Sequence, residues 1–560
     1  MRVCIFQINS KYVHSSLAAW YLYSGVKKYA PSADASVLEG TVNEPIGVLL
    51  DRALSARCDV YCFPSYIWNI GVLEELVVQI KKELPSAITV MGGPEVSMRA
   101  ADMLGRITML DYVLSGEGEE SLPGLIERLL LGGDICKVPG LSGRSEEGIF
   151  SNPPEYLKDQ PPSPYVDEYF QSLNSRIAYI ETSRGCPFRC AYCLSGGDKV
   201  RFFDIEEVKK NILLLANSGT KTVKFVDRTF NADRARAREI FSFIIESRKS
   251  EKIPEGVTFH FEIEGDLVDD DTLGLLSEAE AGLFQFEIGV QSFNQKTLEA
   301  IRRHTDLQRL CYVIKELSSY GNIHIHTDLI AGLPHEDIGS FKRSYNSLYS
   351  LGSHKIQIGF LKLLWGSYMR ENPTLYPCEY ESDAPYKIKS TPWLSEGDIA
   401  ELEQVEWSND TFVSSARFSY TIEYLLKNTE YTPYDLMLRL YEYVYTPSLS
   451  SLEEIYDRVY FSFSRYESID AAVLRDVMIV DRLRSNNTCF IPHSLRVKDE
   501  RMKCVSKKID ALYPKKPHVR RAGAILYTQG VAVWCDYDKK NVVSARYDIH
   551  QLPLSEMEKE

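Results

Sequence analysis

Short apolar runs alternate with amphipathic segments through the first 145 residues. Runs with the length of buried strands are Val3–Ile8, Val60–Phe63, Ile88–Met91 and Tyr112–Leu114, and segments with helical spacing are 15–28, 73–84 and 120–131. Strands separated by helices predict an α/β fold with a doubly wound parallel sheet. Because ligands of such sheets bind at the carboxyl ends of the strands, we expect a binding edge there.

The same alternation returns in residues 177–375, after a segment that we predict to be a linker. That segment, 146–176, contains two Pro-rich stretches that break regular structure. The expected strands are 177–181, 222–226, 257–262, 284–290, 323–330 and 355–361, with helices at 204–217, 233–248, 269–280, 295–302, 306–319 and 337–350. Six βα units predict a partial, TIM-like (β/α)6 barrel rather than a closed eight-stranded barrel.

Residues 376–560 have a different pattern and are interpreted as a C-terminal extension, mainly helical with a terminal β element at 524–534. Its dense aromatic residues favour a helical core over a stacking platform; they are Tyr420, Tyr424, Tyr431, Tyr434, Tyr441, Tyr443, Tyr445, Tyr456, Tyr460 and Phe461. The stretch from Arg496 to Arg521 holds ten Lys or Arg and three acidic residues. We interpret it as a solvated face, with contact to RNA or an anionic substrate as the alternative.

Composition narrows the class of protein. The 560 residues suggest three or four domains at about 150 residues each. A net charge of −14 argues against a general nucleic-acid binder, and twelve cysteines in so long a chain exclude a small disulfide-stapled protein. No run of eighteen apolar residues occurs and the N-terminus lacks a signal-peptide pattern. We therefore expect no membrane segment and a reducing, cytoplasmic location.

Three of the twelve cysteines form a cluster. Cys186, Cys190 and Cys193 follow the strand-like run 177–180 in a loop that contains Gly and Pro, and such a loop can direct three thiolates to one centre. Thiolates are ligands of iron–sulfur clusters and of zinc. A zinc site would need a fourth ligand, but no Cys or His occurs in the next sixty residues, and Cys136 lies fifty residues upstream. Three ligands therefore predict a cluster with one open iron.

The other nine cysteines are interpreted mostly as small buried apolar residues. Cys58 and Cys62, four residues apart, are the alternative metal ligands in this group, although the surrounding sequence predicts a buried strand. The nine are Cys4, Cys58, Cys62, Cys136, Cys311, Cys378, Cys489, Cys504 and Cys535.

The spacing Cys186-x-x-x-Cys190-x-x-Cys193, with Tyr192 before the last cysteine, resembles the signature of radical S-adenosylmethionine (SAM) enzymes. The resemblance implies a [4Fe–4S] cluster whose open iron binds the amino and carboxylate groups of SAM. One electron from an external donor of the flavodoxin or ferredoxin type would then cleave SAM to a 5′-deoxyadenosyl radical. The cofactors carry this chemistry, while the protein positions them and excludes water. Oxygen damages such a cluster, so the resemblance also implies an anaerobic setting.

The resemblance extends to the ends of two earlier strands. Asp227 ends a strand where the family contacts the SAM amino group, although the usual Gly-Gly-Glu is absent; its alternative role is to cap the following helix. Glu262 and Glu264 share one face of their strand, and the family often places a polar residue there near the ribose or substrate.

Two later strands carry the resemblance further. Gln291 and Ser292 match the ribose strand, with neutral groups suited to sugar hydroxyls and the methionyl carboxylate. Gly332 and Leu333 lie where the family's backbone approaches adenine. The nearby histidines are interpreted as structural; they are His304, His324 and His326.

The first domain resembles the Rossmann-like cobalamin (B12)-binding domain that precedes a radical SAM core. The resemblance depends on two Gly-rich turns after strands, because either turn alone would suit any nucleotide or a plain tight turn. Their residues are Gly92, Gly93, Pro94 and Glu95 in the first, and Gly116, Glu117 and Gly118 in the second. The family's Asp-x-His-x-x-Gly motif is absent.

Two further turns of the first domain are expected to face the corrin. Ser65, Tyr66, Ile67 and Trp68 would contact it without ligating cobalt. Asn9, Ser10 and His14 lie at the end of the first strand, and His14 is considered either as a cobalt ligand or as a contact to cofactor or substrate.

The leading hypothesis is a cobalamin-dependent radical SAM methyltransferase acting on an unactivated carbon of a small molecule or an RNA. A second hypothesis keeps both cofactors but ends in rearrangement or cyclisation. A third is a cobalamin sensor or carrier with a degenerate core, against which the intact cysteine motif argues. In the first two cases the fold must place both cofactors around one substrate pocket.

Overall fold

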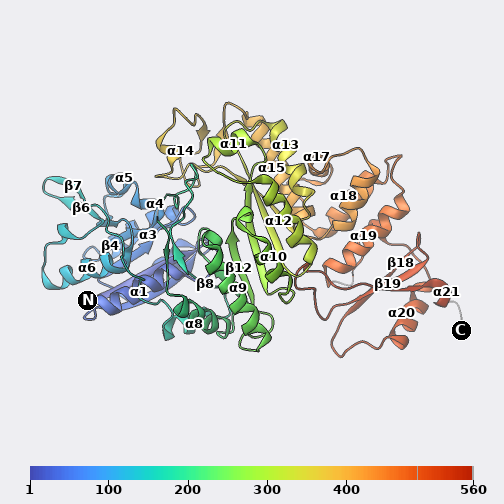
Figure 1. The fold of residues 1–560 in the computed structure, drawn as a ribbon, viewed down its shortest axis with the longest axis horizontal. Helices are drawn as coiled ribbons and strands as arrows, with labels where there is room; N and C mark the ends of the chain where they lie inside the picture. Colours follow the sequence, from blue (N-terminus) through green and yellow to red (C-terminus); the bar gives the residue numbers. More distant parts are fainter. Residues whose placement is uncertain (198, 488–489, 558–560) are drawn as a thin grey trace. The chain divides into compact units, whose positions relative to one another are not determined.

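Figure 1 shows the computed structural model, which describes residues 1–197, 199–487 and 490–557. The chain divides into two units. The first unit contains residues 1–262, 301–303 and 361–389, and the second contains 263–300, 304–360 and 390–560. The domain limits expected at 145, 176 and 375 stay predictions.

The first unit begins with a seven-stranded sheet in the order β2-β1-β3-β4-β5-β6-β7. Its first five strands are parallel, as the apolar pattern predicts; they are β1 (Arg2–Asn9), β2 (Asp34–Thr41), β3 (Val60–Pro64), β4 (Ile88–Gly92) and β5 (Tyr112–Leu114). The accompanying helices are α1 (Leu17–Tyr29), α2 (Ile46–Ala56), α3 (Ile70–Glu83), α4 (Pro94–Ser97), α5 (Ala100–Arg106) and α6 (Gly118–Leu131). The doubly wound α/β fold is confirmed, with β2, α2, α4 and α5 added to the elements that the pattern predicted.

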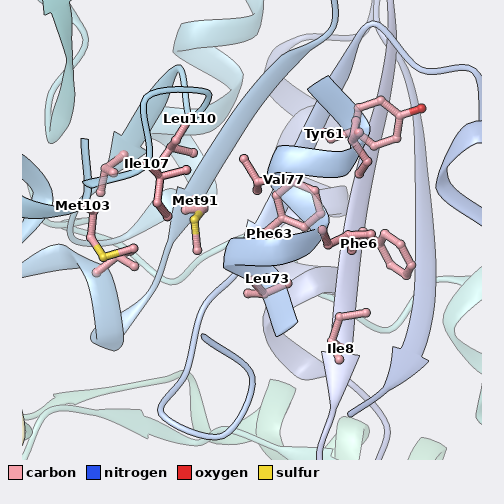
Figure 2. Close-up of a cluster of buried hydrophobic side chains, with 14 of the residues drawn as sticks. Phe6, Ile8, Tyr61, Phe63, Leu73, Val77, Met91, Met103, Ile107 and Leu110 are labelled. Atoms are coloured by element: carbon pink, nitrogen blue, oxygen red, sulfur yellow. The ribbon is translucent and has the colours of Figure 1, made fainter. Parts of the chain in front are cut away.

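A hydrophobic core holds this sheet to its helices. Figure 2 shows Phe6 and Ile8 of β1 and Phe63 of β3 beside Leu73 and Val77 of α3. All five side chains are less than 5 % exposed. The sheet is therefore covered on this face, and its carboxyl edge is the place left for ligands.

The segment 146–176 contains more regular structure than a linker. Strand β6 (Leu141–Ser145) pairs antiparallel with β5, and β7 (Gly148–Ser151) pairs antiparallel with β6, so the first sheet continues past residue 145. Helix α7 (Asp167–Leu173) follows the Pro-rich stretches. The hairpin was missed because its strands are short and lack a long apolar run.

The second sheet is an open, six-stranded parallel sheet, which confirms a partial rather than a closed barrel. In the first unit β8 (Ala178–Ile180) pairs with β11 (Thr222–Phe225), and β11 pairs with β12 (Thr258–Ile263). In the second unit β13 (Phe284–Gln291) pairs with β14 (His324–Ala331), and β14 pairs with β15 (Lys355–Phe360). The intervening helices are α8 (Ile205–Ala216), α9 (Arg234–Lys249), α10 (Asp270–Ser277), α11 (Gln295–Ala300), α12 (Leu307–Tyr320) and α13 (Ile338–Tyr349).

The C-terminal part of the second unit is mainly helical and ends in a three-stranded antiparallel sheet, as expected. Tyr434 and Tyr456 are fully buried, which supports an aromatic helical core, although Phe461 is half exposed. Its helices are α15 (Glu396–Ser408), α16 (Ser419–Asn428), α17 (Pro433–Val444), α18 (Leu452–Phe463), α19 (Ala471–Ser485) and α20 (Arg501–Leu512), and the strands are β18 (Arg521–Leu526), β19 (Val531–Asp536) and β20 (His550–Pro553).

The cysteines outside the motif divide by burial. Cys4, Cys58, Cys62 and Cys535 are buried, as predicted for packing residues, whereas Cys136 and Cys504 are exposed. Cys311 and Cys378 are half-buried, and Cys489 lies outside the described residues. Among the described helices, none combines the length and the apolar character needed to cross a bilayer.

Candidate functional site

The three-cysteine loop leaves strand β8 and is closed at its base by a short antiparallel pair. This pair joins β9 (Ser183–Arg184) to β10 (Arg201–Phe202). Gly185 turns the chain with a φ of +101°, a conformation that an L side chain rarely adopts. Inside the loop, the backbone N–H of Gly197 donates to the carbonyl of Phe188 at 2.9 Å. The backbone N–H of Ala191 donates to the carbonyl of Ile301, so the loop is also tied down between its cysteines.

Each motif thiol has a polar neighbour, and none forms a disulfide. Cys186 is buried, with its Sγ 3.4 Å from Thr229 Oγ1. The Sγ of Cys193 accepts the backbone N–H of Ser195 at 3.4 Å. Burial raises the pKa of the Cys190 thiol, while the Arg303 guanidinium, 4.0 Å from its sulfur, acts in the opposite direction. Three thiols with a cationic neighbour suit a thiolate-ligated metal cluster.

Asp227 lies beneath the start of this loop and not at the N-terminus of a helix. Its carboxylate accepts three hydrogen bonds, from the backbone N–H and the hydroxyl of Thr182 and from the hydroxyl of Ser183. The carboxyl is fully buried, and this burial raises its pKa to about 6. Helix α9 is capped instead by Asp233, so the capping alternative for Asp227 is wrong.

Arg184, one residue before Gly185, is the main site-forming residue that the sequence interpretation missed. Its guanidinium is bonded to Glu181 at 2.8 Å and to Glu119 at 2.9 Å, and lies 3.3 Å from Glu117. Glu117 and Glu119 follow β5 of the first sheet, whereas Glu181 follows β8. This Arg184 network therefore links the second Gly-rich turn to the cysteine loop. An isolated Arg between Ser and Gly carries no sequence signal for it.

The carboxylates of the Gly-rich turns are less available to a ligand than the sequence suggests. Glu117 is ion-paired with Arg184 and Arg201, and Glu95 accepts hydrogen bonds from Arg99 and from the hydroxyl of Tyr386. Both carboxylates are occupied within the chain. The backbone of these turns is still the part that a ligand could approach.

Close packing explains the glycines of both turns. Gly93 has a φ of +105°, and a Cβ there would lie 2.7 Å from the carbonyl oxygen of Ser65. Gly116 has a φ of +84°, and a Cβ there would lie 2.6 Å from Pro154. Gly92 and Gly118 are also tight, at 3.0 Å from the Leu114 oxygen and 2.6 Å from Leu22.

Exposed apolar side chains gather on the loops that follow the parallel strands of the first sheet. Tyr12 follows β1, Trp68 follows β3 and Met98 follows β4, and each is 49–68 % exposed. Tyr66 stacks on Trp68 with ring centres 4.4 Å apart and planes 5° apart. Ser65, by contrast, is fully buried, and Pro94 is exposed. A flat stacked pair at this edge provides an apolar surface for a large planar ligand.

The loop after β1 is held against the start of β8. His14 Nδ1 lies 2.6 Å from the hydroxyl of Tyr179, and the Asn9 amide donates to the His14 carbonyl at 3.3 Å. Burial, with Lys11 and Lys224 nearby, lowers the pKa of His14, which favours the neutral imidazole. Ser10 is half-buried beside these residues.

In the second unit, β13 ends in strained backbone. The pairing with β14 shifts between Gly289 and Gln291, and Gln291 has a φ of +70°. Gln291 Oε1 is buried, and it finds no hydrogen-bond partner in the portion of the chain that the structure covers. Left-handed backbone at a residue other than glycine, together with a buried polar atom that has no partner, is typical of a ligand-binding position.

The hydroxyl of Ser292, in contrast, is already engaged. It donates to Glu336 Oε1 at 2.7 Å and accepts the backbone N–H of Asn294 at 3.0 Å. The hydroxyl of Ser344 donates to the same Glu336 oxygen at 2.9 Å. Burial raises the pKa of Glu336 to about 7, so this carboxyl helps to fix the turn after β13.

The remaining predicted residues lie as follows. Glu262 on β12 is 3.4 Å from Lys224 of β11. Gly332 has a φ of +94° after β14, and Leu333 is fully buried. Tyr192 is half-buried, and burial raises its pKa. Of the basic stretch, Arg501, Lys516 and Arg521 are ion-paired with acidic neighbours.

Models of known protein families match three segments of the chain. The B12 binding domain matches residues 4–126, the radical SAM superfamily matches 180–348, and a protein of unknown function (DUF4080) matches 374–522. The three segments follow one another in the order expected of the first domain, the partial barrel and the extension.

The curated relatives include two methyltransferases. The 2-(S-pantetheinyl)-carbapenam-3-carboxylate methyltransferase of Streptantibioticus cattleyicolor is 30 % identical over 315 residues, which are 53 % of this chain and 46 % of that protein. The cobalamin-dependent radical SAM methyltransferase TokK of Streptomyces tokunonensis is 28 % identical, with the same two shares. The chain thus spans about half the length of these relatives.

A solved structure shares the fold over a longer range. The cobalamin-dependent S-adenosylmethionine radical enzyme OxsB, with aqua-cobalamin and S-adenosylmethionine bound, has a TM-score of 0.59 at 16 % identity. The match covers 92 % of this chain and 82 % of that one. At this identity the likeness concerns the fold alone.

Proposed function

We propose that the chain is a cobalamin-dependent radical SAM methyltransferase, because the radical SAM superfamily model matches residues 180–348 and the B12 binding domain model matches residues 4–126 ahead of them. The observation that carries the proposal is the three-cysteine loop, with its reduced thiols and the Arg303 guanidinium beside one of them. A [4Fe–4S] cluster, SAM and cobalamin would together supply a radical that activates a C–H bond and the methyl group that replaces the hydrogen.

Cys186, Cys190 and Cys193 would hold the cluster. Arg303 would lower the cost of gathering negative thiolates in a partly buried loop. Asp227 would act one step away, because its hydrogen bonds to Thr182 and Ser183 fix the backbone from which the loop departs.

Gln291 is the residue of the second unit best prepared to bind SAM. Its buried, unsatisfied amide oxygen and left-handed backbone suit hydrogen bonding to a sugar hydroxyl or an ammonium group. Ser292 would contribute through its position rather than its hydroxyl, which Glu336 already engages. Tyr192, Glu262, Gly332 and Leu333 are proposed as neighbouring contacts on the same grounds as in the sequence analysis.

Cobalamin would bind at the carboxyl edge of the first sheet. The stacked Tyr66 and Trp68 would cover the corrin, and the close-packed backbone at Gly92–Gly93 and Gly116–Gly118 would lie along its tail. His14 contacts Tyr179 through Nδ1, and we propose that its other ring nitrogen contacts cofactor or substrate rather than ligating cobalt.

The substrate is proposed to be a small molecule. An RNA substrate would need the basic stretch, and three of its cations are engaged in ion pairs. Neutralising Lys507, Lys508, Lys515 and Lys516 together is expected to leave substrate turnover unchanged; loss of turnover with intact cofactor binding would favour RNA or another polyanion. A one-electron donor of the flavodoxin or ferredoxin type and a cytoplasmic, anaerobic setting complete the proposal.

Anaerobic reconstitution with iron, sulfide, SAM, cobalamin and a strong reductant tests the function. We expect about four iron atoms per chain, the content of one [4Fe–4S] cluster. We also expect formation of 5′-deoxyadenosine and transfer of label from methyl-labelled SAM to a product. The triple variant C186A/C190A/C193A should lose all three, whereas C504A, which removes an exposed cysteine, should lose none.

The pattern of failure separates the alternatives. Cobalamin binding without iron or SAM cleavage would favour a sensor or carrier. SAM cleavage with a product that carries no labelled methyl group would favour rearrangement or cyclisation.

A further inference from the structure

A second group of potential metal ligands lies on neighbouring strands of the second unit. One oxygen of Glu287, one nitrogen of His326 and one oxygen of Asp328 all lie within 4.8 Å of one another. Glu287 of β13 pairs directly with His326 of β14, and Gly289 pairs with Asp328. Side chains two residues apart share a face of a strand, so all four positions lie on the same face.

His326 provides the observation that goes beyond a cluster of acidic residues. Its side chain is 7 % exposed, and its Nε2 lacks a hydrogen-bond partner among the described residues. Asp328 Oδ1 is also buried, with no hydrogen-bond partner in the same part of the chain. A buried polar atom without a partner carries a free-energy cost, so two such atoms aimed at one space require an explanation.

The geometry between these two atoms is that of two ligands around one ion. Nε2 and Oδ1 lie 3.2 Å apart, within ion-pair distance when the imidazole is protonated, but their geometry forms no hydrogen bond. Two donors at right angles around a small divalent ion, each about 2.1 Å from it, would lie about 3 Å from each other. An ion would thus satisfy both atoms in the positions that they already have.

The surrounding charges also favour a cation. Glu287 and Asp328 supply two carboxylates, and Asp410 is a third acidic residue that interacts electrostatically with Lys355 and His326. Lys355 pairs with His326 across β15 and is the nearby cation that the register provides. Three acidic groups against one lysine leave a local excess of negative charge.

We propose that Glu287, His326 and Asp328 bind a divalent first-row cation of the Mn²⁺ or Fe²⁺ type. An imidazole with two carboxylates suits these ions, whereas the three-thiol loop is suited to softer iron–sulfur chemistry. Three protein ligands leave coordination positions open for an oxygen donor from water or substrate. The proposal stands independently of the methyltransferase function, because it depends on no residue of the cysteine loop.

Mn²⁺ titration followed by electron paramagnetic resonance tests the site, using the full chain after removal of bound metal by chelation. We expect one tight Mn²⁺ per chain, since bound Mn²⁺ loses the six-line signal of the free ion. H326A and the isosteric D328N should each weaken binding by about tenfold or more. H304A, which removes an exposed histidine of the same unit, and C186A/C190A/C193A should bind Mn²⁺ as the wild type does.

The thermal unfolding midpoint provides a second, independent measurement of Mn²⁺ binding. Mn²⁺ should raise the thermal unfolding midpoint of the wild type and not that of D328N, because a ligand that binds the folded state stabilises it. If H326A fails to fold, D328N alone decides the outcome. Wild type that binds Mn²⁺ no more tightly than D328N, or loss of binding in the triple cysteine variant, would overturn the proposal.

Discussion

The carboxyl edges of the two parallel sheets have opposite chemistry. At the first sheet, the loops after the strands expose Tyr12, Trp68 and Met98. The carboxylates of the Gly-rich turns are already bonded to arginines and to a tyrosine. In the first unit, the strand ends of the second sheet carry the thiol loop and buried Asp227; in the second unit, β13 ends at the unsatisfied amide of Gln291. An exposed apolar edge suits a large flat ligand, whereas a polar, partly buried edge suits a small charged one.

The Arg184 network joins these two edges, so its removal should have the largest effect. R184M leaves Glu117, Glu119 and Glu181 without their shared cation, in surroundings where the arginine is only 19 % exposed. Breaking a buried ion-pair network by removing one partner costs about 3–5 kcal/mol. We expect a lower thermal midpoint together with loss of both iron and cobalamin, measured on the anaerobically reconstituted chain.

R189M is the matched control, because Arg189 is an exposed arginine of the same loop. It should keep iron and cobalamin. If R184M lost one cofactor and kept the other, the two edges would be independent and the network would be a local support only.

Glu336 tests the polar edge alone through pH. Its pKa is raised from 4.5 to about 7, so its contribution to stability is complete below about pH 4.5 and is lost as pH rises through about 7. E336Q keeps the acceptor oxygen for Ser292 and Ser344 but cannot ionise. Above pH 7 we expect it to be more stable than the wild type by up to about 3 kcal/mol, with no such difference near pH 4.

The measurement is the denaturant midpoint of both chains at several pH values. Asp227 and Asp481, with pKa values raised by burial to about 6 and about 7, titrate equally in both chains and cancel in the comparison. E299Q, at an exposed glutamate of the same unit, is the control variant. A difference between E336Q and wild type that stayed constant with pH would contradict the assignment of a buried, titrating carboxyl.

Trp68 tests the apolar edge, with a smaller expected effect. W68A removes one partner of the Tyr66 stack and should weaken cobalamin binding by about tenfold, because a stacked aromatic contact contributes about 0.5–1.5 kcal/mol beyond its buried area. Iron content should not change. Absorbance titration with cobalamin and iron analysis of the same sample measure both.

Two further variants sharpen this comparison. F461A removes another half-exposed aromatic and should alter neither cofactor. Q291A should show the reverse of W68A, with weaker SAM binding and unchanged cobalamin binding. Equal effects of W68A and Q291A on both cofactors would mean that the edges do not act separately.

Much of the fold could be predicted from the sequence because local periodicity dominates in βα units. Strand β13 was expected at 284–290 and lies at 284–291, and α13 was expected at 337–350 and lies at 338–349. Strands β2, β6 and β7 were missed because they lack a continuous apolar run; β2 and β7 are the edges of the first sheet, and β6 lies beside β7. The three cysteines were identified because ligand spacing is local.

The sequence by itself determined which residue types stand at the strand ends, since each strand and the loop after it are contiguous. Only the tertiary structure decided which of these groups are already occupied. Glu95 and Glu117 are held by arginines, Ser292 is held by Glu336, and Arg184 reaches back to residues more than sixty positions away. Hydrogen bonding and burial depend on neighbours that are distant in the chain, so no local pattern specifies them.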